Sequence, residues 1–231
     1  MLEVRGLEAF YGPAQVLFGI DLEVRAGEMV VLQGLNGAGK STLLKSLMGL
    51  EVRTRGSVRW QAPGAAAQDI SAWPAYQRAR AGLGYVAEDR RLFSAMSVRE
   101  NLRVAGGRGC EARQAWVLER FALLQPMLDR PAGLMSGGEQ QLLAMARTLM
   151  TSPRLLLLDE PCEGISPLLV ESIRDALVAL RSEGLGLLVA EQNRLVVQAA
   201  DRVLHLLAGT VTHLPSKEHH GHDNHGLRPE L

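Results

Sequence analysis

The residues with the clearest chemical purpose lie in the loop 34–42, which reads GLNGAGKST and fits the pattern G-x-x-x-x-G-K-[ST] at every fixed position. Its glycines let successive backbone N–H groups turn toward one centre and bind an anion. Lys40 adds a full positive charge, and Ser41 offers a hydroxyl to Mg²⁺. We therefore predict a site for the phosphates of ATP. The predicted nucleotide-binding residues are Gly34, Asn36, Gly37, Ala38, Gly39, Lys40, Ser41 and Thr42.

Two adjacent carboxylates, Asp159 and Glu160, follow the apolar run 155–158. Ligands of parallel sheets bind at the carboxyl ends of the strands, where this pair would lie. We predict that Asp159 holds Mg²⁺ through water and that Glu160 is the general base that activates the attacking water. A solvated acidic pair at a strand end is the alternative, and the phosphate loop in the same chain favours the catalytic interpretation.

A third motif, residues 134–141, reads LMSGGEQQ and lies between the other two in the chain. Ser136 is placed to cap the helix that follows, and Glu139 completes a capping box. The two glycines expose backbone N–H groups at the start of that helix. Taken alone, this motif would indicate a helix cap and nothing more.

The order of the three motifs resembles that of the ABC-type ATPases, whose usual signature is LSGGQ. Here Met135 replaces the leucine and Glu139 replaces the final glutamine. The resemblance covers about residues 2–214. In that family two ATPase domains pair head to tail, and the signature of one chain contacts the ATP of the other. The residues that the resemblance assigns to this contact are Ser136, Gly137 and Gly138.

Three further positions receive roles from the resemblance. Tyr11 matches an aromatic residue that stacks on adenine, although an aromatic residue at a sheet edge would look the same. Glu88 stands where a glutamine contacts Mg²⁺, so it is a candidate metal ligand. Gln192 stands where a histidine contacts the γ-phosphate, and its amide can donate a hydrogen bond but cannot carry a proton at neutral pH. We predict a catalytic role for Gln192, with a cap on the following helix as the alternative.

The stretches 88–93, 163–165 and 191–193 look like those of the ATPase subunits of branched-chain amino acid importers, and urea importer ATPases are close relatives. This resemblance implies an ATPase motor on the cytoplasmic side of the membrane. Its implied partners are a second ATPase subunit, identical or homologous, two transmembrane permease subunits and, indirectly, a periplasmic or extracellular solute-binding protein. The transported solute is not identified by these residues.

Other classes of function fit the sequence less well. A soluble ABC protein of translation or DNA repair usually carries two ATPase units or a long coiled coil, and no sustained heptad repeat separates Lys40 from Ser136. A P-loop kinase would lack the motif at 136–138. An inactive regulatory subunit would lack Glu160.

The segments that position these motifs alternate between strand and helix patterns. Apolar alternation and continuous apolar runs predict strands at 16–24, 29–32, 82–86, 155–158 and 185–190. Apolar spacing and cap residues predict helices at 40–50, from 97 onward, at 111–124, after 138 and at 166–182. This pattern predicts an α/β fold with a mainly parallel sheet and an inserted helical subdomain at about 87–150. To it the resemblance adds a P-loop NTPase core with an N-terminal antiparallel β part.

Composition sets limits on partners and location. The 231 residues contain 25 Lys plus Arg and 25 Asp plus Glu, so no net charge draws the chain to nucleic acid. Two cysteines, Cys110 and Cys162, are too few for a disulfide framework and fit a reducing compartment. No signal peptide or spanning apolar run is visible, so we expect one soluble ATPase domain over 1–214 that meets the membrane only through partners. The polar, His-rich tail at 215–231 is expected to be disordered, with a loose metal-binding tract as the alternative.

Overall fold

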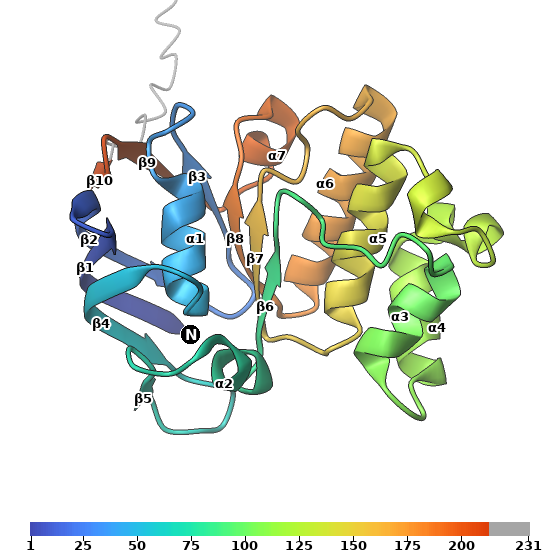
Figure 1. Ribbon diagram of the computed structural model, residues 1–231, viewed down its shortest axis with the longest axis horizontal. Coiled ribbons are helices and arrows are strands. Elements are labelled where there is room, and N and C mark those ends of the chain that lie inside the picture. Colours follow the sequence, from blue (N-terminus) through green and yellow to red (C-terminus); the bar gives the residue numbers. More distant parts are fainter. Residues whose placement is uncertain (213–231) are drawn as a thin grey trace, which may run out of the picture.

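The computed structural model describes residues 1–212, so the predicted tail at 215–231 lies outside the described residues. The strands form two sheets, with the orders β2-β1-β4-β5 and β10-β9-β3-β8-β7-β6 (Figure 1). The strands are β1 (Leu2–Tyr11), β2 (Ala14–Val24), β3 (Met29–Gln33), β4 (Arg53–Trp60), β5 (Gln68–Asp69), β6 (Leu83–Val86), β7 (Leu155–Asp159), β8 (Gly186–Ala190), β9 (Arg202–Leu207) and β10 (Thr210–Thr212). The helices are α1 (Lys40–Met48), α2 (Ala75–Arg80), α3 (Val98–Gly106), α4 (Glu111–Arg120), α5 (Gly137–Leu149), α6 (Pro167–Ser182) and α7 (Arg194–Gln198), with 3-10 turns η1 (Ala122–Met127) and η2 (Ala132–Leu134).

The six-stranded sheet is mainly parallel. Its strands β3, β6, β7, β8 and β9 pair in parallel, and β10 turns back antiparallel to β9. Every residue of β7 and β8 is buried, which explains why these strands are continuous apolar runs in the sequence. Because parallel strands end at one edge, the segments that follow β3, β6, β7 and β8 meet at that edge.

Alternate residues of β3 face two different apolar layers. Val30 and Leu32 pack in a cluster with α1 and the antiparallel sheet, so α1 lies between the two sheets (Figure 1). Met29 and Val31 belong to a second cluster that includes residues of α5 and α6 on the opposite face. The strand and helix that flank the phosphate loop are therefore fixed by packing on both sides.

Helices α3, α4 and α5 stand together on the side of the molecule away from the antiparallel sheet (Figure 1). Ser97 and Ser136 begin α3 and α5, and both predicted capping boxes are formed, with Glu100 and Glu139 as partners. The boundaries 87–150 of an inserted subdomain stay a prediction. Within residues 1–212, no helix combines the length and the apolar character that crossing a membrane requires.

The predicted strands and helices are confirmed at most positions, but the predicted C-terminal end of one helix is wrong. Helix α4 ends at Arg120 instead of 124, and the 3-10 turn η1 follows with Pro126 inside it. Phe121 leaves the helical conformation, with φ −121° and ψ 56°, and this ends α4; Pro126, which has no N–H to donate, further prevents the α-helix from resuming. Strands β1, β4, β5, β9 and β10 were not predicted individually.

Candidate active site

The loop between β3 and α1 requires glycine for two reasons. Gly37 and Gly39 have positive φ values of 81° and 106°. A Cβ atom on Gly34 would instead collide with the carbonyl oxygen of Leu206 in β9. Gly39 is the N-cap of α1 and brings no side-chain hydrogen bond to its first turn. Within residues 1–212, no cap side chain therefore occupies the first N–H groups of α1, which suits an anion such as a phosphate.

Lys40 connects the phosphate loop with the acidic end of β7. It is buried, and its Nζ donates a hydrogen bond to the carbonyl oxygen of Gly34 at 2.8 Å. The same Nζ lies 3.0 Å from Oε1 of Glu160. The loop and the carboxylate, which the sequence predicted separately, therefore meet at this ammonium group.

Asp159 ends β7 and is held by two hydroxyl groups. Ser41 Oγ donates to its Oδ1 at 2.9 Å, and the Tyr85 hydroxyl donates to its Oδ2 at 3.1 Å. Burial raises the pKa of Asp159, and the hydrogen bonds from Ser41 and Tyr85 act against this rise. Burial and the Asp159 charge raise the pKa of Tyr85, which therefore stays a donor. Sequence reasoning missed Tyr85, and the available signal was a hydroxyl in the otherwise apolar strand β6.

Glu160 follows β7 with φ 47°, a left-handed conformation that residues other than glycine rarely adopt. Burial opposes its ionisation, but hydrogen bonds from Lys40 and Glu163 and the Lys40 charge outweigh burial and lower the pKa of Glu160. The hydrogen bond with Glu160 is in turn the main cause that raises the pKa of Glu163. Glu160 is therefore kept ionised, the form that a general base needs.

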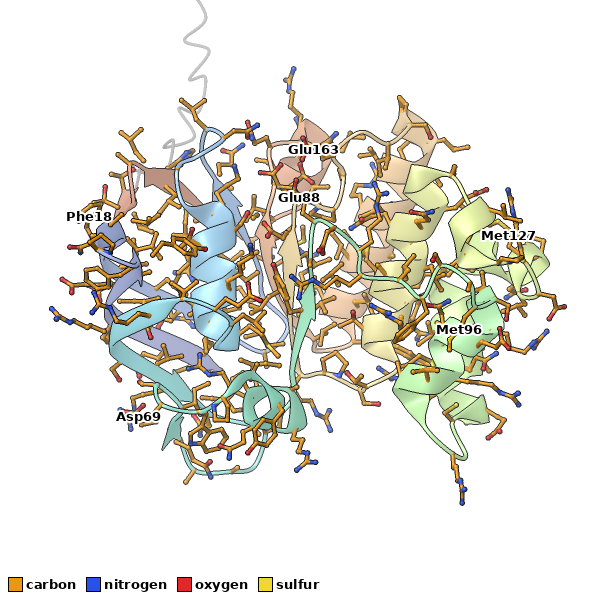
Figure 2. All side chains as sticks on the ribbon, in the orientation of Figure 1. Phe18, Asp69, Glu88, Met96, Met127 and Glu163 are labelled. Atoms are coloured by element: carbon orange, nitrogen blue, oxygen red, sulfur yellow. The ribbon has the colours of Figure 1, made fainter. Side chains whose placement is uncertain are left out.

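A cavity of about 290 Å³ opens above the phosphate loop. Figure 2 labels Glu88 and Glu163, which reach this region from the segments after β6 and β7. The lining residues are Val16, Asn36, Gly37, Gly39, Lys40, Ser41, Thr42, Glu88, Glu160 and Glu163. The structure thus brings the predicted loop, base and candidate metal ligand Glu88 around one space.

Gln192 also reaches the phosphate loop. Its Nε2 donates a hydrogen bond to Oδ1 of Asn36 at 3.0 Å. The alternative that Gln192 caps the following helix is wrong, because Asn193 is the N-cap of α7 and its Oδ1 accepts from the N–H of Leu195 at 3.0 Å. Sequence reasoning also missed the buried Glu191, whose carboxylate accepts hydrogen bonds from neighbouring backbone N–H groups.

Several predicted nucleotide contacts do not line the cavity: Gly34 and Gln192 line a neighbouring one, and Ala38, Tyr11 and residues 136–138 line neither. Ser136 caps α5, and Gly138 is packed so closely that an added Cβ would collide with Leu169. Tyr11 ends β1, is 43% exposed and pairs with Ala14 of β2. Contacts of Tyr11 and of the signature with ATP therefore stay predictions.

The oxygen atoms near Ser41 suit Mg²⁺. This ion prefers hydroxyl, carboxylate, phosphate and water oxygens, and it usually keeps several waters. Ser41 and Asp159 supply the first two kinds. Within residues 1–212, no group of three or more His, Cys, Asp or Glu side chains could hold a metal by itself. The residues therefore fit an ion that shares its ligand shell with phosphate.

Comparison with known proteins places this site in a family. The ABC transporter family matches residues 17–163, more than half of the chain. The chain belongs to the ABC transporter family. As an ABC cassette it binds nucleotide, and its enzymatic activity is ATP hydrolysis.

Several relatives of this ABC cassette align over nearly its whole length. It is 38% identical over 216 residues to the high-affinity branched-chain amino acid transport ATP-binding protein BraG of Pseudomonas aeruginosa, covering 91% of each chain. It is 33% identical over 217 residues to the probable branched-chain amino acid transport ATP-binding protein LivF of Archaeoglobus fulgidus, covering 91% of this chain and 90% of that one. It is 32% identical over 232 residues to the lipopolysaccharide export system ATP-binding protein LptB of Escherichia coli, covering 94% of each.

Solved structures confirm the predicted α/β P-loop fold of the cassette. An ATP-binding subunit of an ABC transporter matches with a TM-score of 0.75 and 29% identity, covering 91% of this chain and 88% of that one. A dimeric cassette in a post-hydrolysis state with ADP and Pi matches with a TM-score of 0.80 at 22% identity, covering 92% and 97% of the two chains. At that identity the second match supports the fold alone.

Proposed function

We propose that this chain is the ATP-hydrolysing motor subunit of an ABC importer for branched-chain amino acids or a similar small polar solute. The observation that carries this proposal is the 38% identity to BraG over 91% of both chains. The match to LivF supports it at 33% identity, and because the export protein LptB matches almost equally at 32%, the preference for import rests on BraG. Urea import and a soluble, non-transport ABC function are the alternatives that the test below must separate.

In this proposal the residues around the cavity hydrolyse ATP. The loop N–H groups and Lys40 bind the phosphates, and the ammonium of Lys40 exchanges its contact with Glu160 for one with phosphate. Glu160 then accepts a proton from the attacking water. Gln192 donates a hydrogen bond to the γ-phosphate from the position that it now holds beside Asn36.

Ser41 and, through water, Asp159 would hold Mg²⁺, and Glu88 would contact it from the cavity wall. When bound, this ion supplies positive charge that neutralises the phosphate oxygens. Tyr85 orients Asp159 through its hydroxyl. Tyr11 would stack on the adenine ring from the end of β1.

The same proposal requires partners. Ser136, Gly137 and Gly138 at the start of α5 would contact ATP bound to a second ATPase subunit, identical or homologous. Two transmembrane permease subunits would hold the pair on the inner face of the membrane, and a solute-binding protein would act through them. No nucleic acid is required, in agreement with the zero net charge.

The test is reconstitution of the chain in proteoliposomes with the permeases and solute-binding protein encoded beside its gene. We expect ATP-dependent leucine uptake, and the Glu160→Gln chain is the matched inactive control. Uptake of urea in place of leucine would move the protein to the urea branch. A chain that hydrolyses ATP but copurifies with no permease and supports no uptake of any solute in this assay would overturn the importer proposal and favour a soluble ABC protein.

A further inference from the structure

Glu191, directly after β8, is a buried carboxylate that accepts three backbone N–H groups and lies beside the Cys162 thiol, whose pKa burial and the Glu191 charge raise. Glu191 is 6% exposed. Its Oε2 accepts a hydrogen bond from the N–H of Cys162 at 2.9 Å. Its Oε1 accepts from the N–H groups of Gln192 at 2.8 Å and Asn193 at 2.9 Å. Burying such a charge is costly unless hydrogen bonds compensate it, so these contacts are strong restraints.

The two oxygens of Glu191 hold two different segments of the active site. One oxygen holds residue 162, two positions after Glu160, and the other holds the backbone of Gln192. The backbone adds two links at the same edge of the sheet. The N–H of Glu160 donates to the carbonyl oxygen of Ala190 at 3.0 Å. The N–H of Glu191 donates to the carbonyl oxygen of Leu32 at 3.2 Å, and Leu32 precedes the phosphate loop.

We propose that Glu191 is a positioning residue for ATP hydrolysis, whose carboxylate fixes the segment of Glu160 relative to that of Gln192 so that both act on one γ-phosphate. This inference rests on the roles proposed above for Glu160 and Gln192. Misplacement of a reacting group by about 1 Å costs on the order of 100-fold in rate. Within residues 1–212, the Glu191 carboxylate forms no hydrogen bond with the phosphate loop or with the side-chain amide of Gln192, so ATP binding should be spared.

The decisive variant is Glu191→Gln, which keeps the shape of the side chain. Its amide offers one oxygen and one NH₂ group, so either orientation turns a donor toward a backbone N–H of one segment. We expect kcat for ATP hydrolysis by the isolated chain to fall by about 10- to 100-fold, while KM for ATP changes by less than about threefold. Glu191→Asp should lose less, because a shorter carboxylate still reaches the N–H groups of Gln192 and Asn193, as in an Asx turn.

The matched control is Glu100→Gln, which also removes a carboxylate that accepts a backbone N–H, from Ser97 at 2.8 Å, but far from the cavity. The Glu100→Gln control should lower thermal stability and leave kcat per folded molecule unchanged.

If Glu191→Gln kept the kcat of the parent chain while Glu160→Gln was slow, this inference alone would be overturned. A parental rate for Glu160→Gln would overturn the proposed role of Glu160 and this inference with it. Equal changes of kcat and KM in Glu191→Gln would also overturn the inference, since they indicate general damage to the site.

Discussion

Lys40 and Glu160 neutralise each other at a distance of 3.0 Å in a site that must also receive highly charged phosphates. The pair is buried on the lysine side, where 3% of the side chain is exposed, so neither charge is well solvated. An incoming phosphate competes with Glu160 for the ammonium group. Removing the Glu160 charge should therefore favour nucleotide binding and, at the same time, remove the base.

The first prediction follows for Glu160→Gln. This variant should bind ATP at least as tightly as the parent, because Lys40 loses its competing partner. Hydrolysis should slow by on the order of 100-fold or more, the size of general-base contributions. Phosphate release under single-turnover conditions, with nucleotide binding measured separately, checks both statements. The exposed Glu171→Gln on α6 is the charge-matched control, and a parental rate in Glu160→Gln would rule out this assignment.

The second prediction concerns Gln192, which donates to Asn36 in the phosphate loop. A hydrogen bond to a charged acceptor contributes about 1.5–3 kcal/mol, so Gln192→Ala should slow hydrolysis by roughly 10- to 100-fold. Gln192→His should stay active and introduce a step in the pH–rate profile near the histidine pKa of ~6.5. Steady-state rates across pH 5.5–8.5 test both variants.

Asn193→Ala is the neighbouring control for this prediction. Its side chain caps α7, so its loss should lower stability by about 1 kcal/mol while the rate per folded molecule stays unchanged. If Gln192→Ala behaved in the same way as Asn193→Ala, contact of Gln192 with the γ-phosphate would be excluded.

At the scale of elements, strands covered on both faces were predictable from the sequence, because burial makes β3, β7 and β8 continuous apolar runs. Strand β1 was missed because its pairing shifts register between Val4 and Leu7, near Gly6 at φ 55°, and this breaks the alternation of apolar and polar residues.

Among the site residues, the phosphate loop could be predicted because its motif is local in the sequence. Tyr85 escaped because its partner Asp159 is distant in the chain, and the link from Glu191 to Cys162 escaped for the same reason, since both contacts form only when the strands align.

The third prediction tests the capping box of α3. Hydrogen bonds from the Ser97 backbone and hydroxyl lower the pKa of Glu100. Because the folded pKa lies below the unfolded value of about 4.3, the stabilisation is fully present above that value and is lost as the pH falls through the folded pKa. The Tm difference between the parent and Glu100→Gln should therefore be largest near neutral pH and shrink below pH ~4.

Ser97→Ala tests the other half of the capping box. It should lower Tm by about 2–4 °C at pH 7, since such caps contribute about 1 kcal/mol. Thermal denaturation followed by circular dichroism measures both, and a constant Tm difference across this pH range would contradict the first.

At the scale of the whole molecule, the cavity above the phosphate loop is lined by only part of the predicted nucleotide-binding set. Its lining residues come from the loop, β2 and the segments after β6 and β7, whereas Ser136 and Gly138 lie at the start of α5 and do not line it. The contact of the signature with ATP that we propose is therefore a contact with ATP held by another chain. In this proposal nucleotide binding promotes pairing.

The fourth prediction is that ATP converts the Glu160→Gln variant from a monomer to a closed dimer. Hydrolysis should be slow in this variant, so the contacts of Ser136 and neighbouring N–H groups with the partner's ATP would persist and shift the association equilibrium. Light scattering should show a doubled mass with ATP, alone or with a candidate partner ATPase. Glu160→Gln combined with Lys40→Ala is the control, and it should stay at the mass of one copy because it lacks the phosphate-binding cation. Ser136→Arg in the Glu160→Gln background should also block pairing while ATP binding is retained, since the added side chain occupies the contact surface. A single-copy mass for Glu160→Gln with saturating ATP, both alone and with the candidate partner, would contradict the head-to-tail pair.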